Sequence, residues 1–108
     1  MHVSTDYNND QLTLHLRGPF TIYEAGAAKS LLLDELHVAD DMEVDLSEVS
    51  EFDTAGLQLL LLMKREALRL DKPLRFHGHS KAVLAVIDLY NLGGVFGDPV
   101  VLAGKGRS

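Results

Sequence analysis

The chain has 108 residues, the length of one domain, and its 46% content of hydrophobic residues is enough for a buried core. It lacks cysteine, which excludes disulfide bonds and thiolate sites, and its net charge of −6 with scattered lysines and arginines argues against a nucleic acid partner. The longest apolar run, residues 59–63, is far shorter than the roughly 20 residues that span a bilayer. No early segment resembles a signal peptide. We therefore expect a cytoplasmic protein without direct membrane insertion.

The first segments predict a hairpin. Residues 3–7 alternate weakly and indicate an edge strand, whereas residues 12–16 alternate apolar and polar side chains as a half-buried strand does. Asn8-Asn9-Asp10 between them is typical of a turn. Gly18-Pro19 is expected to end the second strand. A helix should follow from about residue 21 to about residue 36.

The remaining segments alternate strands and helices. We expect strands at residues 42–46, 74–77 and 99–102, with residues 47–52 as a polar connection. Two more helices are expected, one over residues 54–70 and one from Ser80 to Gly93-Gly94. The pattern predicts a single α/β domain over residues 1–108, with a flexible tail at 103–108. Its mixed sheet should have four to five strands, with three or four helices packed on it.

Asp53 and Thr54 stand at the predicted start of the helix over residues 54–70. Asp53 is a favoured N-cap, because its carboxylate can accept hydrogen bonds from free N–H groups of the first turn. A phosphate on Thr54 would lie near the positive end of the helix dipole and would add about −1.5 to −2 charges. On residue chemistry alone, an ordinary cap followed by a first-turn residue is the simpler interpretation.

The leucine-rich helix has one unusual position on its polar side. At about 100° per residue, its broad apolar face should hold Leu57, Leu60, Leu61, Met63, Ala67 and Leu68, with Leu59 at the edge. Leu62 instead falls in the polar sector, and a leucine there is either a chance exposure or a contact point. The residues of that side, taken with Thr54, form a candidate contact surface: Ala55, Gln58, Leu62 and Arg65.

The run Val44-Asp45-Leu46-Ser47-Glu48-Val49-Ser50-Glu51-Phe52-Asp53-Thr54-Ala55-Gly56-Leu57 resembles the core of STAS domains, which are named after sulphate transporters and anti-sigma factor antagonists. In that pattern a strand ends in Asp-Leu, and Asp-(Ser/Thr)-X-Gly-Leu opens a helix. The segments at residues 14–18 and 80–93 resemble the second strand and the third helix of the same family. The resemblance covers nearly the whole chain and implies a STAS-like fold.

The resemblance also implies a function. In anti-sigma factor antagonists, a partner phosphorylates the residue after the Asp, and that position is Thr54 here. The partner is an anti-sigma factor or serine/threonine kinase with a histidine-kinase-like ATP-binding fold, and phosphorylation abolishes binding. The resemblance thus implies a non-catalytic bacterial signalling module without a cofactor or metal. Its partner-binding residues would be Asp53, Thr54, Ala55, Gly56, Gln58, Leu62 and Arg65.

Two departures from the antagonist pattern leave alternatives open. Thr54 replaces the commoner serine, and Thr21 stands where many antagonists have an acidic residue. Threonine also occurs in STAS subunits of lipid-transport ABC complexes, which bind their ATPase without phosphorylation, and the leucine-rich helix resembles STAS proteins linked to chemotaxis-type signalling. The apolar surplus on that helix and the hairpin edge leave a homodimer open.

Other chemistries find less support in the sequence. His77-Gly78-His79 offers two metal ligands without a third nearby, so a turn with two solvated histidines is the simpler interpretation. Asp45 with Asp53 suits magnesium, which prefers carboxylates, but such an ion would more plausibly arrive with a kinase partner's ATP. A hydrolase using Asp45, Asp53 and Thr54 would need a pocket and an activated nucleophile. The sequence contains no catalytic-triad arrangement, Walker loop or dinucleotide motif.

Overall fold

A computed structural model describes residues 1–90 of the chain. The predicted strand at 99–102, Gly93-Gly94 and the tail at 103–108 lie outside the described residues. The elements follow one another as β1 (His2–Asn8), β2 (Gln11–Phe20), α1 (Ile22–Val38), β3 (Asp41–Phe52), α2 (Thr54–Leu70), β4 (Leu74–His77) and α3 (Lys81–Leu89).

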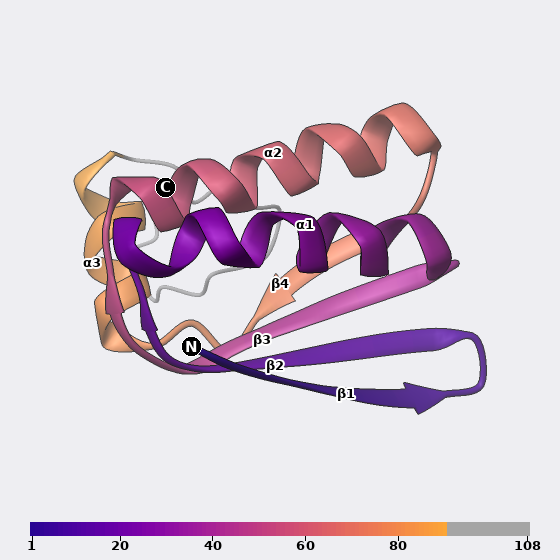
Figure 1. The fold of residues 1–108 in the computed structure, drawn as a ribbon, viewed down its shortest axis with the longest axis horizontal. Coiled ribbons are helices and arrows are strands. Elements are labelled where there is room, and N and C mark those ends of the chain that lie inside the picture. Colours follow the sequence, from indigo (N-terminus) through magenta and orange to yellow (C-terminus); the bar gives the residue numbers. More distant parts are fainter. Residues whose placement is uncertain (91–108) are drawn as a thin grey trace.

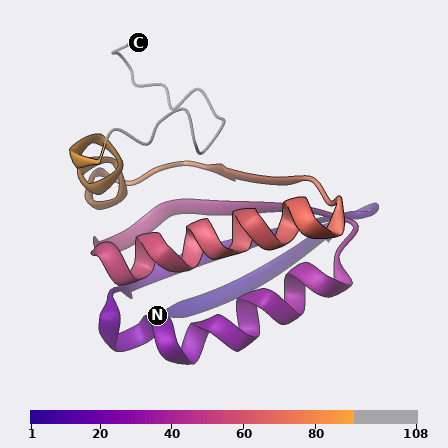
Figure 2. The ribbon, with the colours of Figure 1, turned by 90° about the horizontal axis from the view of Figure 1, so that it is seen from above.

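The strands form one mixed sheet in the order β1-β2-β3-β4. β1 and β2 pair antiparallel as the predicted hairpin, while β3 runs parallel to both β2 and β4. Helices α1 and α2 lie side by side on the same face of the sheet, and α3 stands at the end where α1 and α2 begin (Figures 1 and 2). This confirms the predicted α/β fold with a mixed sheet, with four strands and three helices in the part described.

The core lies between the sheet and the two long helices. Leu12, Leu14 and Leu16 of β2 are buried, and so are Met42, Val44 and Leu46 of β3, because alternate side chains of a strand point to the same face. The helices contribute buried side chains at helical spacing: Ala28, Leu32 and Leu36 from α1, and Leu60, Met63 and Ala67 from α2. Burying each leucine contributes about 1.5–3 kcal/mol to this packing.

Two predicted strand boundaries are wrong. β2 continues through Gly18-Pro19 to Phe20, and β3 includes residues 47–52, which the sequence indicated as a connection. The two strands extend together, but their register shifts between His15 and Arg17 and again between Gly18 and Pro19. Gly18 has φ of +93° there, a conformation that glycine adopts readily. These irregularities disturb the alternation of apolar residues, so the sequence pattern is lost although the strands continue.

Two leucines of α2 also lie elsewhere than predicted. Leu59 is buried rather than at the edge, because α1 packs beside α2 and covers that side as well. Leu68 is 79% exposed although it shares a helix face with the buried Leu57. α3 stands only at the end of the sheet where α2 begins, so it does not cover the far end of this face (Figure 2).

Candidate functional site

The Asp53 carboxylate joins the beginnings of two helices. Asp53 is the N-cap of α2, as predicted, and its Oδ1 accepts hydrogen bonds from the backbone N–H of Ala55 at 2.9 Å and of Gly56 at 3.2 Å. Its Oδ2 accepts a third bond, at 3.0 Å, from the N–H of Ile22, the first residue of α1. One side chain therefore satisfies donors of both helices and holds Thr54 at a fixed place beside α1.

Thr21 caps the neighbouring helix. Its Oγ1 accepts from the N–H of Tyr23 at 3.3 Å, and the Oε1 of Glu24 accepts from both the N–H and the hydroxyl of Thr21 at 2.8 Å. This is a capping box. The hydrogen bonds from the Thr21 backbone and hydroxyl lower the pKa of Glu24, so a carboxylate stands here even though position 21 is not acidic.

Gly56 lies beneath this surface rather than on it. It is buried, and a Cβ atom there would be 2.5 Å from the carbonyl oxygen of Phe20 and 2.8 Å from the ring of Phe52. These two aromatic rings pack against each other with centroids 5.7 Å apart. Glycine at this position lets α2 begin close to the end of β2, so its role in the site is to bring Thr54 beside α1.

Thr54 is exposed at the first position of α2, and two apolar neighbours are exposed with it. Ile22 and Tyr23, at the start of α1, are 67% and 90% exposed. Sequence reasoning missed this pair. The signal was available, because two large apolar residues directly follow the Thr21 cap while the core stripe of the helix begins only later. We call Ile22, Tyr23, Asp53 and Thr54 the switch face.

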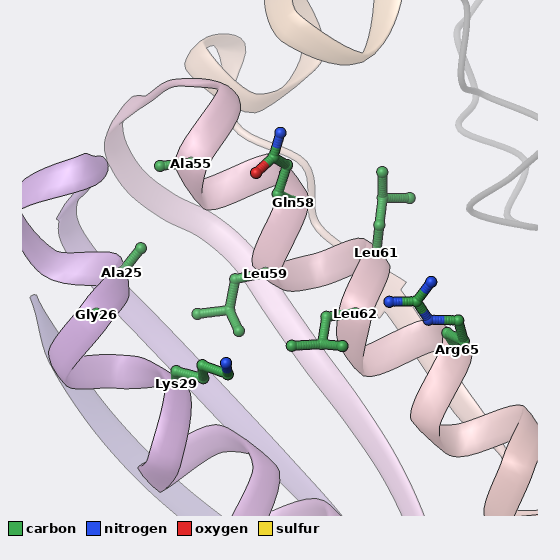
Figure 3. Close-up of a pocket in the computed structure, with 9 residues that line it drawn as sticks. All are labelled: Ala25, Gly26, Lys29, Ala55, Gln58, Leu59, Leu61, Leu62 and Arg65. Carbon is green, nitrogen blue, oxygen red and sulfur yellow. The ribbon is translucent and has the colours of Figure 1, made fainter.

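A groove of about 650 Å³ between α1 and α2 begins beside the switch face. It brings together four of the residues predicted to bind a partner, namely Ala55, Gln58, Leu62 and Arg65 (Figure 3). Leu62 is half-buried and packs partly on the core, so it forms a wall of the groove rather than an isolated exposed side chain. Leu59 and Leu61 complete the α2 side.

The opposite wall of the groove comes from α1 and was missed in the sequence. It consists of Ala25, Gly26 and Lys29 (Figure 3). The periodicity of α1 alone could not have identified this wall, because it does not show which flank of the helix faces α2. Among residues 1–90, those that line the groove include no carboxylate, hydroxyl or imidazole group.

Asp45 belongs to a different part of the molecule. Its Oδ2 lies 2.9 Å from the Nδ1 of His15, and its Oδ1 accepts from the N–H of Ser47 at 2.9 Å. Partial burial raises the pKa of Asp45, but the bonds from Ser47 and His15 outweigh that effect and lower it overall. Asp45 and Asp53 thus have separate partners. His77 pairs with Glu43 at 3.3 Å, and residues 1–90 contain no group of three or more ligand side chains arranged for a metal ion.

Nearly the whole chain matches one known protein family. A family model described as "Mlab, STAS domain" matches residues 3–102. The chain belongs to the STAS domain family. Domains of this family are generally non-catalytic. A comparison with curated proteins gives no match.

Solved structures share the fold of this STAS domain at low sequence identity. An anti-sigma factor antagonist from Mycobacterium paratuberculosis matches with a TM-score of 0.77 and 18% identity, over 89% of this chain and 82% of that one. Unphosphorylated SpoIIAA, an anti-sigma factor antagonist, matches with 0.71 and 14% identity, over 86% and 84% of the two chains. The SpoIIAA of Bacillus has also been solved in its phosphorylated form. A sulfate transporter family protein from Wolinella succinogenes matches with 0.69 and 15% identity, over 85% and 75%.

These similarities show a common fold. In the described residues, no helix is long and apolar enough to cross a membrane.

Proposed function

We propose that this STAS domain is a cytoplasmic signalling module that binds a protein partner through the switch face and is regulated by phosphorylation of Thr54. The observation that carries the proposal is the exposed Thr54 directly after Asp53. The hydrogen bonds of Asp53 join this start of α2 to the start of α1, where Ile22 and Tyr23 are exposed. Exposed aromatic and aliphatic side chains around a polar centre are typical of a binding surface. The resemblance to antagonists suggests the partner, an anti-sigma factor or kinase with a histidine-kinase-like ATP-binding fold.

A phosphate on Thr54 would change the affinity for the partner more than it would change the fold. The N–H groups of Ala55 and Gly56, the natural anion donors at this helix start, already bond the Asp53 carboxylate. The phosphate would therefore stay outward, repelled by Asp53, and would add about −1.5 to −2 charges to the switch face. An interface formed around an uncharged hydroxyl loses affinity when such a charge is buried in it.

The test compares Thr54→Asp with Thr54→Ala in binding to the partner recovered from the native cells. We expect Thr54→Asp to weaken binding by about tenfold or more, which corresponds to about 1.4 kcal/mol. Thr54→Ala should change binding less than about threefold and should abolish regulation by the kinase. Thr5→Asp, at an exposed threonine of β1, is the matched control for charge and should have no effect. Mass spectrometry should find phosphate on Thr54 in the same cells. Equal binding by the wild type and Thr54→Asp would refute the switch.

A second candidate is a constitutive subunit of a larger assembly, such as a lipid-transport ABC complex, or a chemotaxis-linked STAS protein. The observation that favours it is the groove, because Ala55, Gln58, Leu62 and Arg65 extend the surface along α2 well beyond Thr54. In that case Thr54→Ala itself should weaken assembly, and no phosphothreonine should be found in cells. The two proposals therefore give opposite results for the same variant.

A further inference from the structure

In the described residues, the groove between α1 and α2 has apolar side chains and one cation on each wall. Ala25, Leu59 and Leu62 supply the apolar surface, while Lys29 stands on the α1 wall and Arg65 on the α2 wall (Figure 3). Both cations are exposed. Neither forms an ion pair with another residue of the described part, in contrast to Arg17, Arg69 and Arg75.

The charge of this groove is opposite to that of the molecule. The chain carries a formal charge of −6, whereas the described residues that line the groove include two cations and no acidic residue. Three cations elsewhere on the described surface, Arg17, Arg69 and Arg75, pair with neighbouring carboxylates. The positive groove is therefore a local feature, and complementary charge favours an anionic occupant.

We propose that the groove binds an acidic amphipathic helix of the partner protein. From Ala55 to Arg65 the groove follows α2 over ten residue steps, about 15 Å at 1.5 Å per residue, which is roughly three turns of a bound helix. An apolar stripe with acidic residues on both flanks meets the apolar side chains of the groove and the cations of both walls at once. A single-headed amphiphile has one anionic group and can pair with only one of the two walls.

This inference rests on the proposed function in one respect, because it takes the occupant to be a segment of the protein that also contacts the switch face. It does not depend on phosphorylation. Thr54 does not line the groove, so Thr54→Ala should leave binding of a helical probe unchanged. The groove can then fail its test while the phosphorylation switch stands, and the reverse holds as well.

The test uses a synthetic, helix-stabilised peptide of about 14 residues with a leucine stripe flanked by glutamates. Amide NMR spectra of the full chain should show saturable shifts at groove residues such as Ala25, Lys29 and Leu62. A peptide of the same length with lysine in place of glutamate should bind at least about tenfold more weakly. Raising the salt concentration should lower the affinity of the glutamate peptide and raise the affinity of the lysine peptide.

Charge reversal of the walls provides the matched variants. The double variant Lys29→Glu with Arg65→Glu should bind the glutamate peptide about tenfold more weakly and the lysine peptide more tightly. Lys81→Glu, a reversal at the start of α3 outside the groove, should change neither. Circular dichroism confirms that the variants fold. Three results would overturn the proposal: no saturable shift at about 1 mM peptide, equal binding of both peptides, or the same groove shifts from decanoate at a lower concentration than the peptide needs.

Discussion

Replacing Gly56 by alanine tests the close approach of α2 to the end of β2, on which the position of Thr54 depends. The new Cβ would be 2.5 Å from the carbonyl oxygen of Phe20, a backbone atom that cannot swing away. An ordinary carbon–oxygen contact needs about 3.3 Å, so the start of α2 must move by roughly 0.8 Å. That movement would also loosen the hydrogen bond between Asp53 and the N–H of Ile22.

Two opposing effects determine the size of the Gly56→Ala change. Alanine in place of glycine favours a helix by up to about 1 kcal/mol, but less at the third residue of a helix, where part of the turn is still free. Overpacking in a rigid site costs about 1–3 kcal/mol. We therefore expect a net loss of about 1–2 kcal/mol, which lowers Tm by about 4–16 °C in a domain of this size.

Gly26→Ala is the matched control, because it makes the same substitution in α1 at a position with nothing within 4 Å of the added carbon. Here only the helix preference acts, and Tm should rise by about 2–8 °C. Urea and thermal unfolding, followed by circular dichroism, measure both variants against the parent. A Gly56→Ala protein that is as stable as Gly26→Ala would refute the close packing of α2 on Phe20.

Two further predictions concern carboxylates. Asp53→Ala should lower the free energy of unfolding, measured by urea titration, by about 1 kcal/mol or more. Asp53→Asn should lower it less, because asparagine also caps helices. In both variants the backbone amide of Ile22 should exchange with solvent faster, and an unchanged exchange rate would contradict the link between α1 and α2. Hydrogen bonds from Arg69 lower the pKa of Glu66 to about 2 from its ordinary 4.5. The stability that this group contributes is therefore fully present above pH 4.5 and is lost as the pH falls towards 2, so Glu66→Gln should flatten the stability–pH curve in that window.

The start of α2 could be predicted because its determinants are local. Asp53 as the N-cap and Thr54 as the first helical residue follow from side chains that bond their own neighbours in the chain. The third bond of Asp53, to Ile22, could not be predicted, because it joins residues 31 positions apart and depends on where β2 ends. The end of β2 could not be predicted either, because the register shifts around Gly18 interrupt the alternation of apolar and polar residues by which a strand is recognised.

The same distinction explains the groove. The α2 wall could be predicted from a helical projection, because Leu62 falls among polar residues there. The α1 wall could not, because it depends on how the two helices pack together. A projection of one helix also cannot assign Leu59 and Leu68, because burial depends on what lies opposite each side chain. Local periodicity thus identifies which residues can share a face, and the packing of a second element decides which of those faces is buried, exposed or part of a groove.

If one partner contacts both the switch face and the groove, a phosphate on Thr54 would weaken its binding at both surfaces. Lys29 and Arg65 supply two positive charges to the groove, and a phosphate on Thr54 would add about −1.5 to −2 at its entrance. The phosphate would then oppose the attraction of an acidic helix at that end of the groove. This effect needs no movement of α1 or α2, which the hydrogen bonds of Asp53 hold together at their N-termini. Because α2 rises about 1.5 Å per residue, Arg65 lies about 16 Å from Thr54, roughly two Debye lengths at physiological salt, so its interaction with the phosphate is largely screened. The effect of the phosphate should therefore be strongest for the part of the partner nearest Ala55.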